Sequence, residues 1–178
     1  MSRQLVTKLS NRQCFTLTEK DTIKTASEKL QKHNVGVMPV LSEQDKNILP
    51  FLGIHPEKAQ DNPTSVYEMI KENKNKISGI GEIGLDRTYV KSDDEWDIQK
   101  QVFSKQLDYA EKFQKPVSIH SRKTLDDVFD ILSSYKISNI LLHWFDGNKK
   151  QLKKATDLGI YVSYGPLLVY ANDKQALL

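Results

Sequence analysis

The sequence has little cysteine and no long apolar run. Its single cysteine, Cys14, cannot form a disulfide within the chain, which suits a reducing compartment. No apolar run approaches the roughly 20 residues that a membrane-spanning helix needs, and the first ten residues lack the apolar core of a signal peptide. We therefore expect a cytoplasmic protein that does not interact with membranes.

An excess of charge of one sign is also lacking. The 178 residues include 26 basic and 23 acidic side chains, which gives a net charge of +3. This balance is too even for nucleic-acid binding through bulk charge, so any preference for phosphate must come from local groups. With 38% hydrophobic and 28% charged residues, the composition is that of a globular protein and excludes fibrous and disordered chains.

From residue 48 onward, short apolar runs alternate with segments of helical period. The runs predict strands at 48–54, 77–83, 116–120, 139–143 and 160–164. Apolar residues recur at helical spacing between them, in Trp96, Phe103, Leu107, Ala110 and Phe113 and again in Leu125, Val128, Phe129, Leu132 and Tyr135. Alternating strands and helices are typical of βα units around a parallel sheet, so the predicted fold class is α/β.

Three of the four histidines lie at or just after the end of a predicted strand. These are His55, His120 and His143, and Glu82 lies one residue before the end of its own predicted strand. A single histidine on an apolar strand is more often a packed core residue. The carboxyl ends of parallel strands face one side of a sheet, however, so these four side chains are expected to converge. Imidazole and carboxylate are ligands of divalent cations, and magnesium, manganese and zinc are all compatible with this set.

Four motifs carry a resemblance to a known family. They are GIHPE (53–57), GEIGLD (81–86), PVSIHSR (116–122) and HWFDG (143–147). In order and spacing they resemble the signatures of TatD-like metal-dependent hydrolases, over residues 47–178. The resemblance implies a TIM-barrel-like fold and a site with one or two divalent metal ions. It also implies cleavage of phosphodiester bonds, commonly in DNA, so the implied partner is DNA or another phosphodiester.

Carried over by motif, the resemblance assigns roles to five residues. Glu82, His120 and His143 resemble the metal ligands of the family. His55 resembles a residue near the substrate phosphate, and Arg122 is placed to hold a phosphate oxygen. Glu82, His55 and Arg122 are therefore the predicted catalytic residues. Asp86 is expected only to brace the turn of its motif.

The chain also departs from the family pattern. A complete eight-stranded barrel takes about 250 residues, whereas five strands are predicted here from residue 48. The HxH pair with which the family begins is absent from the sequence, and the late aspartate in a TDxP-like strand end has no counterpart. We therefore expect a partial barrel, shorter than that of the family, with weak hydrolysis or none. A non-catalytic remnant with a structural metal is an alternative.

The first 46 residues have a different pattern. Residues 13–17 and 35–41 predict strands and residues 21–34 predict a helix. Over residues 12–46 this βαβ segment resembles the first half of a CBS (cystathionine-β-synthase) domain, with the pattern TIxxAxxxLxxxNVGxxPV at 22–40. The resemblance implies an adenosyl nucleotide as ligand and a regulatory module as an alternative function. The polar stretch 42–47 is the expected boundary, which gives domains of 1–46 and 47–178.

Overall fold

The computed structural model describes residues 17–18, 25, 40–41 and 49–165. The chain divides into two compact units, residues 1–50 and 51–178. In the first unit, β1 (Leu17–Thr18) pairs in parallel with β2 (Val40–Leu41). Parallel neighbours need a crossover between them, as a βαβ segment provides. The remainder of the strands and helix predicted here lies outside the described residues. The predicted domains of 1–46 and 47–178 stay a prediction.

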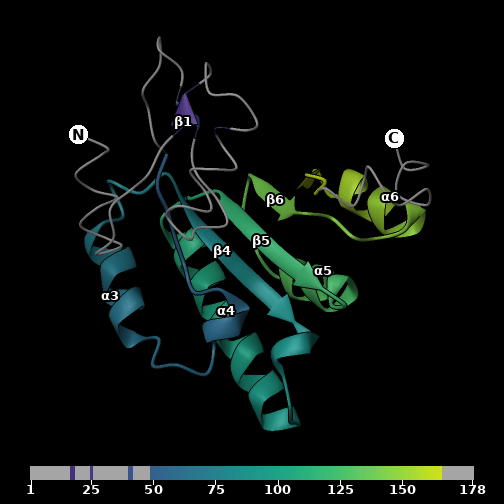
Figure 1. The fold of residues 1–178 in the computed structure, drawn as a ribbon, viewed down its shortest axis with the longest axis horizontal. Coiled ribbons are helices and arrows are strands. Elements are labelled where there is room, and N and C mark those ends of the chain that lie inside the picture. Colours follow the sequence, from purple (N-terminus) through teal and green to yellow (C-terminus); the bar gives the residue numbers. More distant parts are fainter. Residues whose placement is uncertain (1–16, 19–24, 26–39, 42–48, 166–178) are drawn as a thin grey trace. The chain divides into compact units, whose positions relative to one another are not determined.

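The second unit is built on one parallel sheet of five strands, β3 (Phe51–Leu52), β4 (Gly79–Asp86), β5 (Val117–Arg122), β6 (Ile140–His143) and β7 (Tyr161–Val162). The strands lie side by side in chain order, and all four pairings are parallel (Figure 1). Each strand lies within or overlaps a predicted apolar run, so the α/β fold with a parallel sheet is confirmed. Sequential parallel strands are the arrangement found in TIM barrels.

Two predicted strand ends were wrong, and the difference affects the site. β4 continues three residues past Ile83 to Asp86, so Glu82 lies within the strand and not next to its end. β5 continues to Arg122 in the same way. The two extensions pair with each other, Asp86 opposite Arg122. Each extension ends on a charged residue, and strand pairing stabilises polar residues that hydrophobicity alone would place in a loop.

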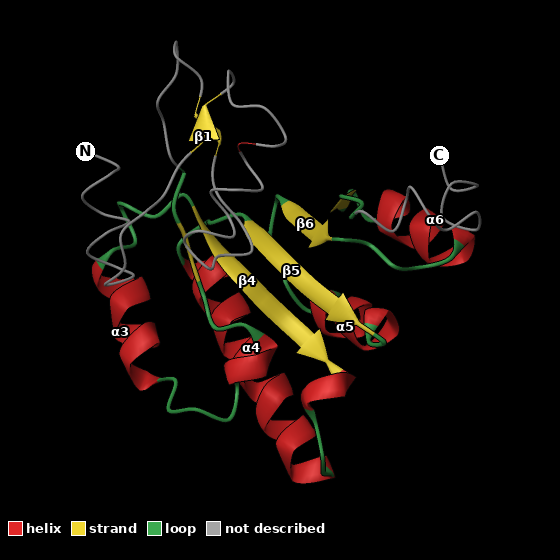
Figure 2. Cartoon of the chain, in the orientation of Figure 1, coloured by secondary structure: helices red, strands yellow, loops and turns green. Residues whose placement is uncertain are grey.

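Helices follow the strands, and α4 and α5 lie behind the long central strands (Figure 2). Their bounds are α3 (Thr64–Glu72), α4 (Asp93–Lys112), α5 (Leu125–Leu132) and α6 (Lys149–Asp157), with short 3-10 helices η1 (Pro56–Lys58) and η2 (Arg87–Tyr89). The helical spacing predicted α4 and α5, although Tyr135 lies beyond the end of α5. There its hydroxyl donates to the carbonyl of Ser104. α3 was not predicted.

Local capping fixes where several helices begin. Ser92 accepts a hydrogen bond from the backbone N–H of Glu95, and three acidic residues follow in the first turn of α4, which complements the helix dipole. Asn148 and Gln151 form a reciprocal capping box at the start of α6. The predicted cap at Asn148 is therefore confirmed. Gly159 adopts φ +68° after α6, as a C-terminal glycine does.

The core lies between the sheet and its helices. Side chains with at most 1% exposure come from both layers, in Ile80, Ile83, Leu85, Phe103, Leu107, Val117, Ile119, Val128, Phe129 and Leu142. Along β5, residues facing the helices are buried, whereas Ser118, His120 and Arg122 alternate with them on the other face. One face of the sheet thus packs on the helices, and the polar residues of β5 lie on the opposite face. Among the described residues, no helix combines the length and the apolar character needed to cross a membrane.

Candidate metal centre

The carboxylate of Glu82 lies at the middle of the candidate site. Its Oε1 atom is 3.0 Å from Nδ1 of His143 and 3.4 Å from Nδ1 of His120. One carboxylate oxygen therefore faces a nitrogen from each of the next two strands. The three side chains keep between 23% and 38% exposure, so a small ligand can reach them from solvent.

Strand register explains why two distant histidines meet here. His120 in β5 and His143 in β6 are direct partners across the parallel pair. On the other side of β5, Gly84 is the partner of His120. A side chain at position 84 would collide with the carbonyl oxygen of His120, since its Cβ atom would lie 2.0 Å away, and the φ of +143° also favours glycine. Gly84 thus lets β4 approach β5 closely at the site.

His55 joins the cluster from the segment after β3. Its Nδ1 accepts a hydrogen bond from the backbone N–H of Glu57, and its ring lies edge-on to His120 with 4.6 Å between centroids. One ligand atom from each of His55, Glu82 and His120 lies within 4.8 Å of the other two. The structure therefore groups His55, predicted to lie near a phosphate, with the predicted ligands Glu82 and His120. His143, the third predicted ligand, reaches the site through its 3.0 Å contact with Glu82.

Asp86 contacts the cluster in a way that the sequence did not reveal. Its Oδ1 accepts hydrogen bonds from the backbone N–H and the hydroxyl of Thr88, which is the bracing role expected for it. Its Oδ2, however, lies 2.8 Å from Nε2 of His120, and its side chain is fully buried. The spacing could have predicted this contact. Glu82, Gly84 and Asp86 are two residues apart, and residues at that spacing on a strand point to the same face.

Asp86 faces Nε2 of the His120 ring, and Glu82 faces its Nδ1. A neutral His120 that donates its Nε2–H to Asp86 turns the lone pair of Nδ1 toward Glu82. This arrangement, in which an outer carboxylate orients a histidine whose other nitrogen is free, is the usual support of a metal-ligating histidine. The donor set, imidazole nitrogens with one carboxylate, fits a divalent cation such as zinc, manganese or magnesium.

The electrostatics of the cluster favour ionised carboxylates. When His120 also carries a proton on Nδ1, its hydrogen bond to Glu82 lowers the pKa of Glu82 to about 2, against the effect of burial and together with His143. Burial disfavours the ionised Asp86, but hydrogen bonds from Thr88 and His120 outweigh it and lower the pKa of Asp86. At His120, burial is likewise outweighed by the two carboxylates, which raise its pKa. Burial and the neighbouring His120 lower the pKa of His55, which favours its neutral, ligating form.

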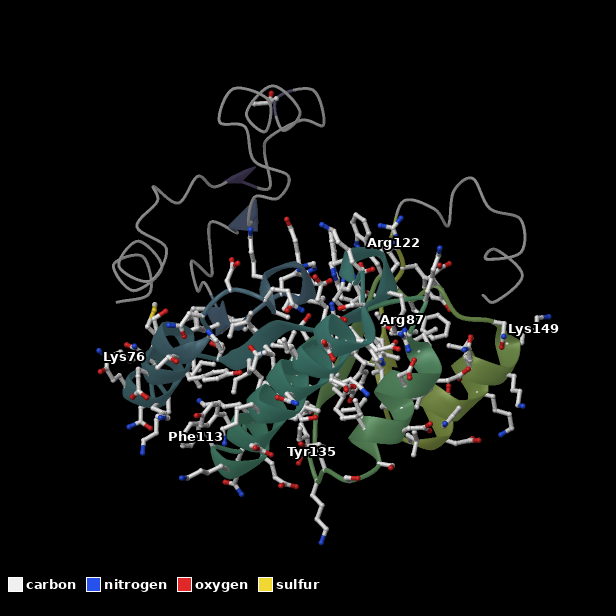
Figure 3. All side chains as sticks on the ribbon, turned by 90° about the horizontal axis from the view of Figure 1, so that it is seen from below. Lys76, Arg87, Phe113, Arg122, Tyr135 and Lys149 are labelled. Carbon is white, nitrogen blue, oxygen red and sulfur yellow. The ribbon has the colours of Figure 1, made fainter. Side chains whose placement is uncertain are left out.

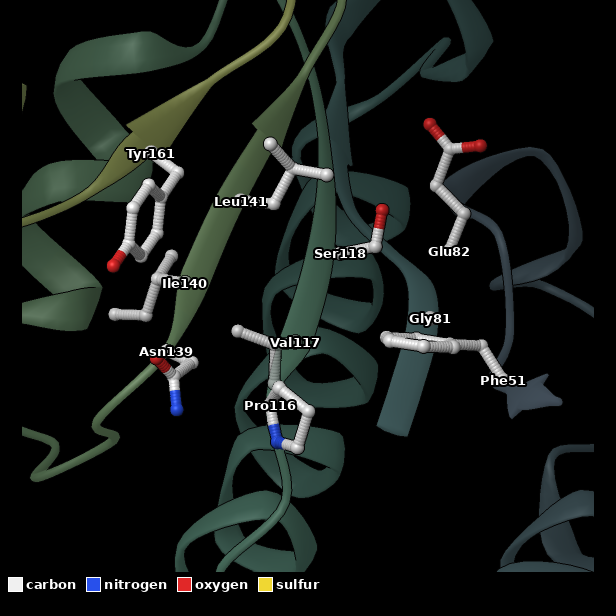
Figure 4. A pocket seen from close by; sticks show the side chains of 10 residues that line it. All are labelled: Phe51, Gly81, Glu82, Pro116, Val117, Ser118, Asn139, Ile140, Leu141 and Tyr161. Carbon is white, nitrogen blue, oxygen red and sulfur yellow. The ribbon is translucent and has the colours of Figure 1, made fainter. Parts of the chain in front are cut away.

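An open groove adjoins the site on the same face of the sheet. Its volume is about 470 Å³, and its lining is mainly apolar, with Phe51, Val117, Leu141 and Tyr161 among the lining residues. Figure 4 shows the Glu82 carboxylate beyond Ser118 at one end of the groove, with the ring of Phe51 beside Gly81. A ligand larger than a metal ion therefore has space next to Glu82.

Arg122 lies further out. It is exposed at the end of β5, two residues after His120 and on the same strand face. Figure 3 shows it at the surface of the described part, apart from Arg87. Its predicted contact with a phosphate stays a prediction.

We expect the replacement of Asp86 by asparagine to weaken divalent-cation binding by about 10- to 100-fold, the range typical for loss of an outer-shell partner. The new amide would present its N–H₂ group to Nε2 of His120 and favour the tautomer that carries its proton on Nδ1, toward Glu82. Calorimetric titration with Mn²⁺ measures the change. Asp94→Asn, in the exposed first turn of α4, is the matched control. Equal affinities in the two variants would contradict a supporting role for Asp86.

A parallel sheet with histidines and a carboxylate converging on one face defines the class of this protein, an α/β protein of the TIM-barrel type with a candidate metal centre. The chain belongs to the family described as TatD related DNase, whose sequence model matches residues 6–177. The match includes residues 12–46, so nothing supports the resemblance of that segment to a CBS domain or the adenosyl-nucleotide ligand that this resemblance implied. A short βαβ pattern is common to many α/β folds, which is why the local comparison was misleading.

Individual relatives agree with this assignment. The chain is 33% identical to an uncharacterized metal-dependent hydrolase of Haemophilus influenzae, over 70% of this chain and 50% of that protein. It is 26% identical to human deoxyribonuclease TATDN3, over 79% of this chain and 56% of that protein. The chain thus spans about half the length of the curated relatives it matches.

A solved structure shows the same fold. The crystal structure of YjjV, a TatD homologue from Escherichia coli, superposes with a TM-score of 0.64 at 21% identity, covering 90% of this chain and 71% of that one. At this identity the likeness concerns the fold alone. It agrees with the five-stranded parallel sheet as part of a TIM-barrel arrangement.

Proposed function

We propose that the chain carries the metal centre of a TatD-type hydrolase that cleaves phosphodiester bonds in DNA. The observation that carries the proposal is the convergence of Glu82 with His120 and His143, in which one carboxylate oxygen lies 3.0 to 3.4 Å from two imidazole nitrogens. Its position on the sheet face, in a family described by DNase activity, favours hydrolysis over a purely structural metal. The cytoplasmic location predicted above belongs to the same proposal.

Each residue has a distinct part in this proposal. Glu82, His120 and His143 hold the cation in this proposal. His55 lies at ligand distance from Glu82 and His120 and serves as a further ligand, and His143 lies 3.0 Å from the Glu82 oxygen. Asp86 keeps His120 in the ligating tautomer. A bound divalent cation supplies Lewis acidity, which makes water a better nucleophile and offsets the charge that develops on a phosphate. Arg122, exposed beside His120, supplies a planar donor group for a phosphate oxygen.

We expect turnover to be slow. The sequence contains no HxH pair and no late TDxP-like aspartate. A smaller ligand set holds a cation less tightly and orients reacting groups less well. Weak activity is therefore the expected result for this 178-residue chain, compared with a family member that contains those residues.

The test is cleavage of single-stranded DNA with added Mn²⁺ or Mg²⁺, comparing this chain with its His120→Ala and His143→Ala variants. Cleavage that depends on the metal and is lost in both variants supports the proposal. Activity that persists in both variants would place the chemistry elsewhere. Metal binding without cleavage above the level of the variants would instead indicate a structural metal in a non-catalytic chain.

A further inference from the structure

Trp144 is held at the surface directly beside the candidate metal centre. It follows the ligand candidate His143, and the two rings lie 5.5 Å apart between centroids with a tilt of 33°. Its side chain is 56% exposed, whereas the next residue, Phe145, is only 3% exposed. The turn after β6 thus sends one aromatic ring into the core and the other to the solvent next to the site.

The backbone maintains this exposure in spite of a local cost. Trp144 adopts φ +50°, a conformation that is unfavourable for a bulky residue. Ser163 stabilises it, because its hydroxyl accepts from the backbone N–H of Trp144 and its carbonyl from that of Phe145. One side of the indole lies against Gly165, where a Cβ atom would be 2.8 Å from Cδ2 of the ring. The ring therefore lies against Gly165 and beside His143 and still keeps more than half of its surface exposed.

A second exposed aromatic ring lies on the other side of the cluster. Tyr89 is 41% exposed, and its ring is 6.1 Å from that of His55. The other tryptophan of the chain, Trp96, is 5% exposed and covered by the guanidinium of Arg87 at 3.5 Å. Exposed aromatic rings thus flank the histidine cluster, at His55 and at His143. Proteins stack the bases of single-stranded nucleic acids on aromatic side chains that lie beside the groups binding the phosphates.

We propose that Trp144 is a stacking platform for a nucleobase of single-stranded DNA, adjacent to the phosphate bound at the metal centre. The inference rests on the proposed function and adds the group of the substrate that is recognised. Duplex DNA keeps its bases stacked on one another, so this contact requires an unpaired base. It therefore predicts a preference for single-stranded over double-stranded substrate.

Fluorescence provides a test that does not depend on turnover, because Trp144 becomes the sole tryptophan in the Trp96→Phe variant. Titration with a short oligothymidylate is expected to quench its emission, whereas an abasic strand of equal length leaves it nearly unchanged. A strand containing 2-aminopurine, titrated into the unmodified chain, gives a second measurement should Trp96→Phe impair folding. Equal quenching by the two strands, or none by either, would overturn the proposal.

Substitution of Trp144 gives the quantitative test. Trp144→Ala is expected to weaken binding of the oligothymidylate by about 5- to 150-fold, the range for loss of one base–aromatic contact, while Trp144→Phe retains most of the affinity. Leu158→Ala, which removes another exposed apolar side chain, is the control. Unchanged affinity in Trp144→Ala would overturn the stacking role even if metal-dependent cleavage persists. Base-dependent quenching without any cleavage would support stacking and contradict the proposed hydrolysis.

Discussion

The Glu82→Gln protein is expected to bind Mn²⁺ more than about 100-fold more weakly than the unmodified chain, a larger loss than that of an outer-shell partner. Glutamine preserves the shape of the side chain but removes the negative charge. Glu82 is the residue whose single oxygen faces both His120 and His143, and its pKa of about 2 keeps it ionised at neutral pH. Without that charge, the cluster offers only neutral donors, imidazole nitrogens and an amide oxygen, to the cation.

Calorimetry and metal analysis of the purified proteins measure this effect. Glu72→Gln, at the exposed end of α3, is the matched control and is expected to bind as the unmodified chain does. Circular dichroism establishes whether the variant remains folded. Comparable Mn²⁺ affinity in a folded Glu82→Gln protein would show that the cation is held elsewhere, and the proposed metal centre would have to be abandoned.

The Phe103→Ala protein is expected to lose about 3–5 kcal/mol of unfolding free energy. Phe103 is fully buried on α4, among the side chains that join this helix to the sheet. Its removal leaves a cavity in a layer that cannot collapse around it. Because small domains are stable by only about 5–15 kcal/mol, this change is a large part of the total.

Urea unfolding followed by circular dichroism gives the difference in free energy. Ile98→Ala, on the same helix but with 40% of the side chain exposed, should cost much less. A loss below about 1 kcal/mol in Phe103→Ala, similar to that of the control, would mean that the packing of α4 on the sheet contributes little to stability.

Much of the fold could be predicted because its signals are local. The apolar runs gave all five strands of the sheet, and the helical spacing around Phe103 and Phe129 gave α4 and α5. Helix α3 was missed. The extension of β4 to Asp86 was also missed, because it ends on a polar residue whose strand conformation depends on a partner far along the chain, Arg122.

The comparison with a CBS domain shows the limit of local patterns. Residues 12–46 matched a strand, a helix and a second strand with suitable turn residues, but many α/β proteins share that order. The family match, which runs from residue 6, depends on the whole chain and outweighs the local similarity. A pattern of about 35 residues is therefore weak support for a family and for the ligand that the family implies.

The sequence alone named His55, Glu82, His120 and His143 as candidate site residues, because their positions at predicted strand ends follow from hydrophobic patterning and from the order of strands and helices. Only the tertiary structure brought Asp86 to His120, 34 residues away, and it fixed which atoms of the expected pair Glu82 and His143 meet. It also decided that Trp144 lies open beside the site whereas Trp96 is buried. Strand register and burial determine these contacts. Both arise from pairings between residues that are distant in sequence, so composition and periodicity alone do not predict them.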